Sequence, residues 1–169
     1  MSVRLWYPQL DVYDAVRRMA ALLTAWKLRP PARERLYIVD FYFANPPLLH
    51  RTHMPDQARK AFNELKVVRP EKSFLSYPSA PILFQKMSEV QRQALQTLIG
   101  KGLINLDALS NGVVEPSLAG GQLFRERMIQ LVPEAEKPLL EFLTGKFAAI
   151  GDDDILGLRR STGLRRLSQ

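Results

Sequence analysis

Two groups of side chains have the types and spacing that could bind a metal ion. His50 and His53 are the only histidines, and Asp56 follows three residues after the second. Two imidazoles and one carboxylate are fewer ligands than a closed zinc site uses. The run Asp152–Asp154 could hold a hard divalent cation, but adjacent aspartates rarely all point to one centre. We therefore expect no metal ion and no cofactor.

The motifs of common catalytic centres are missing from the sequence. It contains no Gly-x-Ser-x-Gly nucleophile motif, no phosphate-binding glycine loop, no His-Glu-x-x-His zinc motif and no cysteine. Asp40 and Glu141 lie near apolar runs and could be perturbed bases, but such carboxylates are more often paired with an arginine or face a partner. We expect a protein that is not an enzyme. Catalysis by Asp40 or by the aspartate run is kept as a third hypothesis.

Length and composition are those of one globular unit. The chain has 169 residues, of which 46% are hydrophobic and 24% charged, and its net charge is +7. Residues 1–35 and 155–169 each carry a net charge of +4, so the body of the chain is nearly neutral. The N-terminus lacks the pattern of a secretory signal, and no stretch has the ~20 apolar residues of a spanning helix. We expect a cytoplasmic protein with no membrane contact.

Apolar periodicity predicts a mainly helical chain. The first helix should begin at Asp11, a capping residue with Asp14 as its partner. The run 36–44 is apolar almost all round, which fits a buried strand or a buried helix. We choose a helix because helix-forming residues precede it and Asn45-Pro46-Pro47 ends it. The predicted helices span 11–27, 32–44, 55–66, 82–99, 118–131 and 134–150.

A glycine-rich run, Leu98–Ile104, ends the longest of these helices in the middle of the chain. Two strand-like runs, Leu103–Leu106 and Val113–Glu115, then flank Asn111-Gly112, a preferred hairpin turn. Helices followed by a hairpin is the element order of a winged helix; generic mixed helical packing is the alternative. The predicted fold is mainly α (α+β): an N-terminal helix and linker (1–31), a winged-helix-like core (32–117), additional C-terminal helices (118–151) and a basic tail (152–169).

DNA binding would depend on the third helix of such a core. Its polar side chains are Lys86, Arg92, Gln93, Gln96 and Lys101, opposed by Glu89. The wing would carry Asp107 and Glu115 but no lysine or arginine, which disfavours contact with phosphate. The predicted fold therefore indicates DNA binding, whereas the local charge is typical of winged helices that dock proteins.

The tail interleaves leucines with pairs of arginines. It is either a disordered basic end or a segment that becomes ordered on a partner, where leucines fill pockets and arginines meet carboxylates or phosphates. Together, Leu48, Leu49 and the tail leucines provide more apolar surface than a small domain readily buries. The predicted partner interface comprises Leu36, Phe41, Tyr42, Leu48, Leu49, Leu156, Leu158, Arg159, Arg160, Leu164, Arg165 and Arg166.

Four runs together resemble a known family. They are RLYIVDFY at 35–42, PPLL at 46–49, GKGLI at 100–104 and GLRRSTGL at 157–164. The chain resembles the middle components of bacterial ABC-three-component systems, which are winged-helix-like proteins encoded between an SMC-like ABC ATPase and an effector.

This resemblance implies a non-catalytic adaptor that bridges the ATPase and a nuclease-like effector in defence against phage or plasmid DNA, as in Lamassu-like systems. Contact with DNA would then be made through the complex. The alternative is a stand-alone winged-helix transcriptional regulator that reads an operator with Arg92, Gln93 and Gln96.

Overall fold

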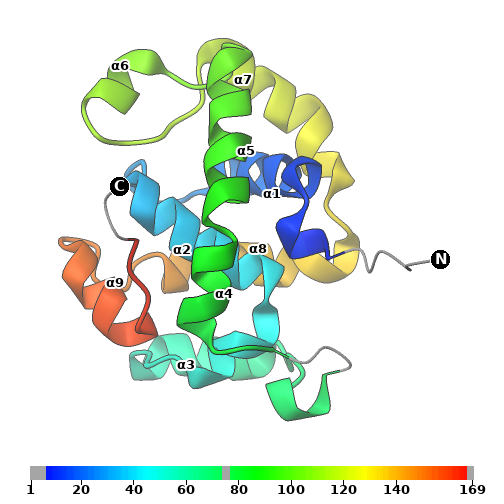
Figure 1. Ribbon diagram of the computed structural model, residues 1–169, viewed down its shortest axis with the longest axis vertical. Helices are drawn as coiled ribbons and strands as arrows, with labels where there is room; N and C mark the ends of the chain where they lie inside the picture. The colour runs from blue at the N-terminus through cyan, green and yellow to red at the C-terminus, as the bar shows by residue number, and fades with distance from the viewer. Residues whose placement is uncertain (1–6, 74–76, 167–169) are drawn as a thin grey trace.

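Helices make up the regular structure of residues 7–73 and 77–166, which are the residues that the computed structural model describes (Figure 1). Within these residues β pairing is limited to two isolated antiparallel bridges, Ala32–Val113 and Ile104–Pro116. The α-helices are α1 (Val12–Ala25), α2 (Arg33–Ala44), α3 (Asp56–Glu64), α4 (Ala80–Lys86), α5 (Ser88–Gly100), α6 (Leu106–Ser110), α7 (Leu118–Leu123), α8 (Lys137–Phe142) and α9 (Ile155–Thr162).

Shorter helical segments extend or connect these helices. Five 3₁₀ segments, Pro8–Leu10, Pro46–Arg51, Pro70–Lys72, Ile129–Leu131 and Glu134–Glu136, lie in the described residues. π-helical turns at Phe124–Met128 and Leu143–Phe147 continue α7 and α8. The helices predicted over 118–131 and 134–150 are therefore present, but their hydrogen-bond pattern changes along their length.

Helix α1 begins where the sequence predicts. The Asp11 side chain accepts a hydrogen bond from the backbone N–H of Asp14, with 3.1 Å between Oδ1 and N. Ala15, Met19 and Leu22 recur at helical spacing and are fully buried. This face packs against α5, which crosses α1 near the centre of the molecule in Figure 1.

Helix α2 lies at the centre of the fold. Every residue from Arg35 to Phe43 is buried, which confirms the choice of a buried helix for this run. The helix ends at Asn45, whose side-chain amide donates to the carbonyl of Phe41 at 2.9 Å. Pro46 then prevents its continuation.

The helix predicted over 82–99 is two helices, α4 and α5, which meet at Met87. The Met87 side chain is completely buried at this junction, and its sulfur lies 3.4 Å from the side-chain nitrogen of Asn45. Apolar spacing continues across the junction, so the sequence pattern alone does not separate the two helices.

The prediction of a β-hairpin wing after α5 is wrong. Helix α6 occupies residues 106–110, where the hairpin was expected, because the Asn105 side chain caps it by accepting from the N–H groups of Asp107 and Ala108. Asn111-Gly112 then ends this helix instead of turning a hairpin, and Gly112 has a φ of +87°. The winged-helix architecture is not confirmed, and the four-part division of the chain stays a prediction.

A buried polar network connects α1, α2 and α5. The Arg18 guanidinium is paired with the Asp40 carboxylate, at 2.7 Å from Nε to Oδ1, and these side chains are 2% and 0% exposed. Arg18 also binds Asp14 at 2.6 Å. Burial lowers the pKa of Arg18, but pairing with Asp40 and Asp14 outweighs burial and raises it overall. The Gln91 amide donates to Asp40 Oδ2 at 2.8 Å and to the Tyr37 carbonyl at 2.9 Å.

We expect Asp40→Leu to lower the free energy of unfolding by about 3–5 kcal/mol, because it leaves the buried Arg18 charge without its main partner. Adding Arg18→Met should recover part of this loss, since neither charge of the buried pair then remains. Urea denaturation followed by circular dichroism measures both effects. Glu141→Gln, which breaks an exposed ion pair with Lys27, is the control and should change the midpoint far less. A double variant as unstable as Asp40→Leu would contradict this account.

Candidate partner interface

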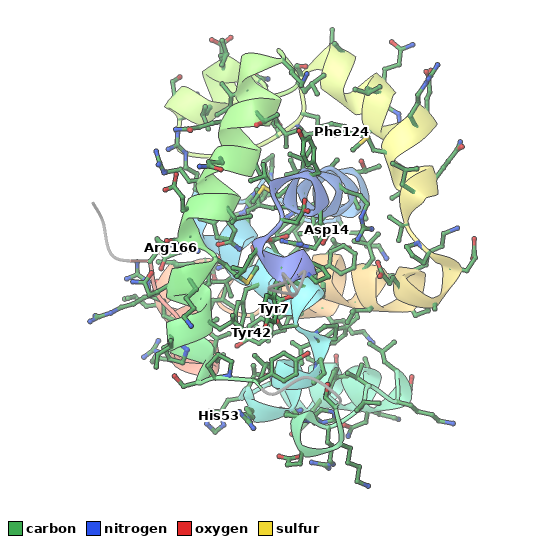
Figure 2. The ribbon with its side chains drawn as sticks, turned by 45° about the vertical axis from the view of Figure 1, so that its right-hand side comes forward. Tyr7, Asp14, Tyr42, His53, Phe124 and Arg166 are labelled. Atoms are coloured by element: carbon green, nitrogen blue, oxygen red, sulfur yellow. The ribbon has the colours of Figure 1, made fainter. Side chains whose placement is uncertain are left out.

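The apolar part of the predicted interface is core. Leu36, Phe41, Tyr42, Leu48 and Leu49 are each 0–1% exposed, because α2 and the 3₁₀ turn after it are covered by other helices. Phe41 makes edge contacts with Tyr42 and with Phe84 of α4. Figure 2 shows Tyr42 among the side chains at the middle of the molecule. These five side chains are not accessible to a partner, which corrects the prediction.

The described part of the tail, up to Arg166, packs against the rest of the same chain. Helix α9 packs on α2, and Leu158 and Leu164 are 0% and 1% exposed. The backbone N–H of His53 donates to the Ser161 carbonyl at 2.8 Å. Leu167 lies outside the described residues. The leucine spacing indicates correctly that these leucines pack on an apolar surface. That surface, however, belongs to the same chain.

Two glycines allow this close approach of α9. The chain turns at Gly151, which has a φ of +60°, and a Cβ atom built on Gly157 would lie only 2.8 Å from the Cα of Gly151. A side chain at Gly157 would therefore push α9 away from the turn that precedes it. Arg35 fixes the same turn by donating to the carbonyls of Ala148 and Ile150, at 2.9 and 2.7 Å.

One carboxylate, that of Glu34, binds the docked tail at two points, the middle of α9 and the last described residue. Arg159 binds it through Nε at 2.9 Å and through Nη2 at 2.6 Å. The backbone N–H of Arg166 donates to Glu34 Oε1 at 2.9 Å. Partial burial raises the pKa of Glu34, but the hydrogen bonds from Arg159 and Arg166 outweigh it and lower the pKa overall. The ionised form of Glu34 therefore stabilises the docked tail.

Arg166 joins the tail to the buried polar network. Its guanidinium lies over the Phe84 ring at 3.9 Å and over the Tyr37 ring at 5.3 Å from the ring centroids. It donates to the Phe84 carbonyl at 3.1 Å and to the side-chain oxygen of Gln91. The amide of Gln91 in turn binds Asp40. Asp14, Arg18, Asp40, Gln91 and Arg166 thus form one continuous series of contacts.

The remaining predicted interface residues lie on the surface. Leu156, Arg160 and Arg165 are exposed, whereas Arg159 is held by Glu34. The predicted DNA-contacting residues Lys86, Arg92, Gln93, Gln96 and Lys101 are also exposed. Glu89 binds Arg92 at 2.7 Å and Gln93 at 2.9 Å on the outer face of α5. The sequence could not show that the end of the tail lies beside α5.

The residues considered for metal binding have other contacts. His50 lies 2.7 Å from the Val67 carbonyl and packs against the Phe62 ring, whereas His53 is exposed. Asp154 caps α9 by accepting from the N–H of Leu156. In residues 7–73 and 77–166 no group of three or more His, Asp or Glu side chains is arranged to hold a metal ion. Asp40, the candidate base, is bound by Arg18 and Gln91 instead of facing a cleft.

The structure also has an exposed apolar edge that the sequence pattern does not predict. We define it as Leu106, Leu118 and Leu123, whose exposed fractions are 64%, 97% and 36%. Two backbone segments, 103–105 before α6 and 115–117 before α7, lie side by side at this edge. They are joined by hydrogen bonds from Asn105 N to the Glu115 carbonyl and from Ser117 N to the Leu103 carbonyl. A hollow beside Leu118 is lined by side chains that include Leu23, Asn105, Ser117 and Arg125. A helix-capping signal before Leu118 was available in Ser117, but no spacing rule marks a first-turn leucine as exposed.

Comparison with known proteins identifies the family. The family model described as ABC-three component (ABC-3C) system Middle Component 5 matches residues 4–167. The chain therefore belongs to this family of middle components, and the resemblance found in the sequence is confirmed. No curated protein and no solved structure matches it. In the described part of the chain no helix is long and apolar enough to cross a membrane.

Lowering the pH should weaken the docking of α9 through Glu34. Because its folded-state pKa is lowered, this group stabilises the fold above its unfolded pKa of about 4.3 and loses that effect as the pH falls through the folded value. Glu34→Gln should cost about 1–2 kcal/mol at pH 7 and remove this part of the acid dependence. Denaturation at pH 7 to 3 measures the first effect, and amide hydrogen exchange of residues 155–166 locates it. Glu126→Gln, at an exposed position of the Phe124–Met128 turn, is the control. Unchanged exchange in Glu34→Gln would refute the role of Glu34.

Proposed function

We propose that this chain is a non-catalytic adaptor that bridges an SMC-like ABC ATPase and a nuclease-like effector in a bacterial defence complex against phage or plasmid DNA. The family match over residues 4–167 is the observation that carries the proposal, because a middle component of a three-component system works beside two other proteins. The docked tail limits which surfaces can contact other subunits, because its buried leucines, Leu158 and Leu164, are packed against residues of the same chain.

The apolar edge is the surface we assign to a partner subunit. Leu118 is 97% exposed, which leaves nearly the whole side chain in contact with water. Burying one leucine in a partner's pocket contributes about 1.5–3 kcal/mol. The adjoining hollow is lined in part by Arg125, an exposed residue whose guanidinium group a partner's backbone or side chains can pair with. An apolar centre with a polar rim is the usual composition of a protein–protein interface.

Leu156, in the first turn of α9, is a second position that we assign to a partner subunit. Its side chain is 52% exposed. Deleting residues 156–169 would also remove Leu158 and Leu164 from the core, so a deletion cannot separate binding from folding. Single substitutions at exposed positions are the appropriate test.

We expect Leu118→Arg to reduce copurification of the chain with its co-expressed ATPase and effector subunits by at least about tenfold, because burying an unpaired charge is unfavourable in addition to the missing apolar burial. Ile82→Arg, at an exposed apolar position of α4, is the matched control and should copurify normally. Leu156→Arg tests the α9 surface in the same assay. Thermal unfolding should show intact folds. Normal recovery of the complex with both Leu118→Arg and Leu156→Arg would exclude these surfaces as the bridge.

A further inference from the structure

Docking of the tail gathers arginines from three distant parts of the sequence. Arg33 begins α2, Arg92 lies on α5, and Arg160 and Arg165 flank the end of α9; all four are exposed. Glu34, the neighbour of Arg33, binds both Arg159 and the backbone of Arg166. We call Arg33, Arg92, Arg160 and Arg165 the basic rim. In Figure 1 the last described residues run from the end of α9 past α4 and α5 toward the start of α2.

Electrostatic contacts around Tyr37 place the first part of this rim. Burial raises the pKa of Tyr37, while the positive charges of Arg33, Arg166 and Arg92 act in the opposite direction. Arg166 also stacks on the Tyr37 ring at 5.3 Å. Arg33 of α2 and Arg92 of α5 therefore lie near the same side chain on which Arg166 of the tail stacks.

The carboxylates near the rim leave its charge largely free. Glu34 is held by Arg159 and by the Arg166 backbone, and Asp40 is paired with Arg18. Among the described residues, Arg33, Arg160 and Arg165 form none of the ion pairs found within 4.0 Å. Glu89 holds Arg92, but an exposed pair three residues apart on a helix is readily exchanged for a stronger anion. The aspartates at 152–154 precede α9 at its opposite end.

The composition of this surface favours phosphate over a protein partner. Apart from Leu156, one turn before Arg160, the exposed large apolar residues lie outside α2, α5 and α9 in the described chain. Protein interfaces depend on buried apolar centres, whereas nucleic-acid interfaces are polar and strongly positive. Gln93 and Gln96 add exposed hydrogen-bonding groups on α5. Because α9 is fixed by Glu34 and by its buried leucines, the arginines it carries lose less freedom on binding.

We propose that the basic rim binds the phosphate backbone of duplex DNA directly, without reading its sequence. This contact differs from insertion of a recognition helix, since α2 and the docked tail supply three of its four guanidinium groups. It does not depend on the bridging role, because the isolated chain carries every group involved.

The test is the affinity of the full-length chain for a fluorescein-labelled 20-base-pair duplex, measured by anisotropy at 50–200 mM salt. We expect Arg33→Gln/Arg160→Gln/Arg165→Gln to weaken binding by on the order of tenfold or more, and to reduce the salt slope by about 0.9 for each phosphate that the variant no longer neutralises. The control Arg69→Gln/Arg127→Gln removes two exposed positive charges that lie outside the basic rim and should bind with an affinity close to that of the unaltered chain. Circular dichroism confirms that each variant is folded.

A gain of affinity provides an independent check. Glu89→Gln removes the carboxylate that holds Arg92 and Gln93, so it should tighten duplex binding by about two- to threefold at low salt. The proposal is overturned if the unaltered chain does not bind the duplex at 50 mM salt, or if the control loses as much affinity as the rim variant. It is also overturned if the rim variant binds DNA normally but fails to copurify with its partner subunits, because the rim would then contact an acidic protein.

Discussion

Burial of the Asp40 carboxylate is the constraint on which the rest of the fold depends. A charge with no access to water requires a close opposite charge and further hydrogen bonds, and these come from Arg18 on α1 and Gln91 on α5. These contacts form only if Arg18 and Gln91 lie level with Asp40 along their helices. The carboxylate therefore sets how α1 and α5 lie against α2, in addition to the apolar packing between them.

The same network extends to the end of the described chain. Gln91 uses its amide nitrogen on Asp40 and its oxygen on Arg166, so the last described residue is connected to the centre of the molecule. Glu34 adds the second attachment, outside the core and near the surface. Because these contacts are polar and directional, they fix the position of the tail more narrowly than Leu158 and Leu164 alone could do.

Docking of the tail separates two kinds of surface on one small protein. The tail arginines lie beside α2 and α5, where Glu34 holds Arg159 and the backbone of Arg166, while exposed leucines lie on α6 and α7. A middle component of a three-component system needs surfaces of different chemistry if it is to contact different partners. The fold supplies them without a catalytic cleft at Asp40, whose oxygens are engaged by Arg18 and Gln91.

The sequence by itself determined the helices that carry strong local signals, such as the capped start of α1 at Asp11 and the proline-bounded run of α2, because caps and prolines act within one turn. It also determined the family, through runs spread along the chain. Only the tertiary structure decided that Asn111-Gly112 closes a helix rather than a hairpin. It also decided that Leu48 and Leu158 are core and Leu118 is surface. Leucine spacing shows that a face will be buried but not what buries it, since that depends on Glu34, Gln91 and Arg166 meeting from distant parts of the chain.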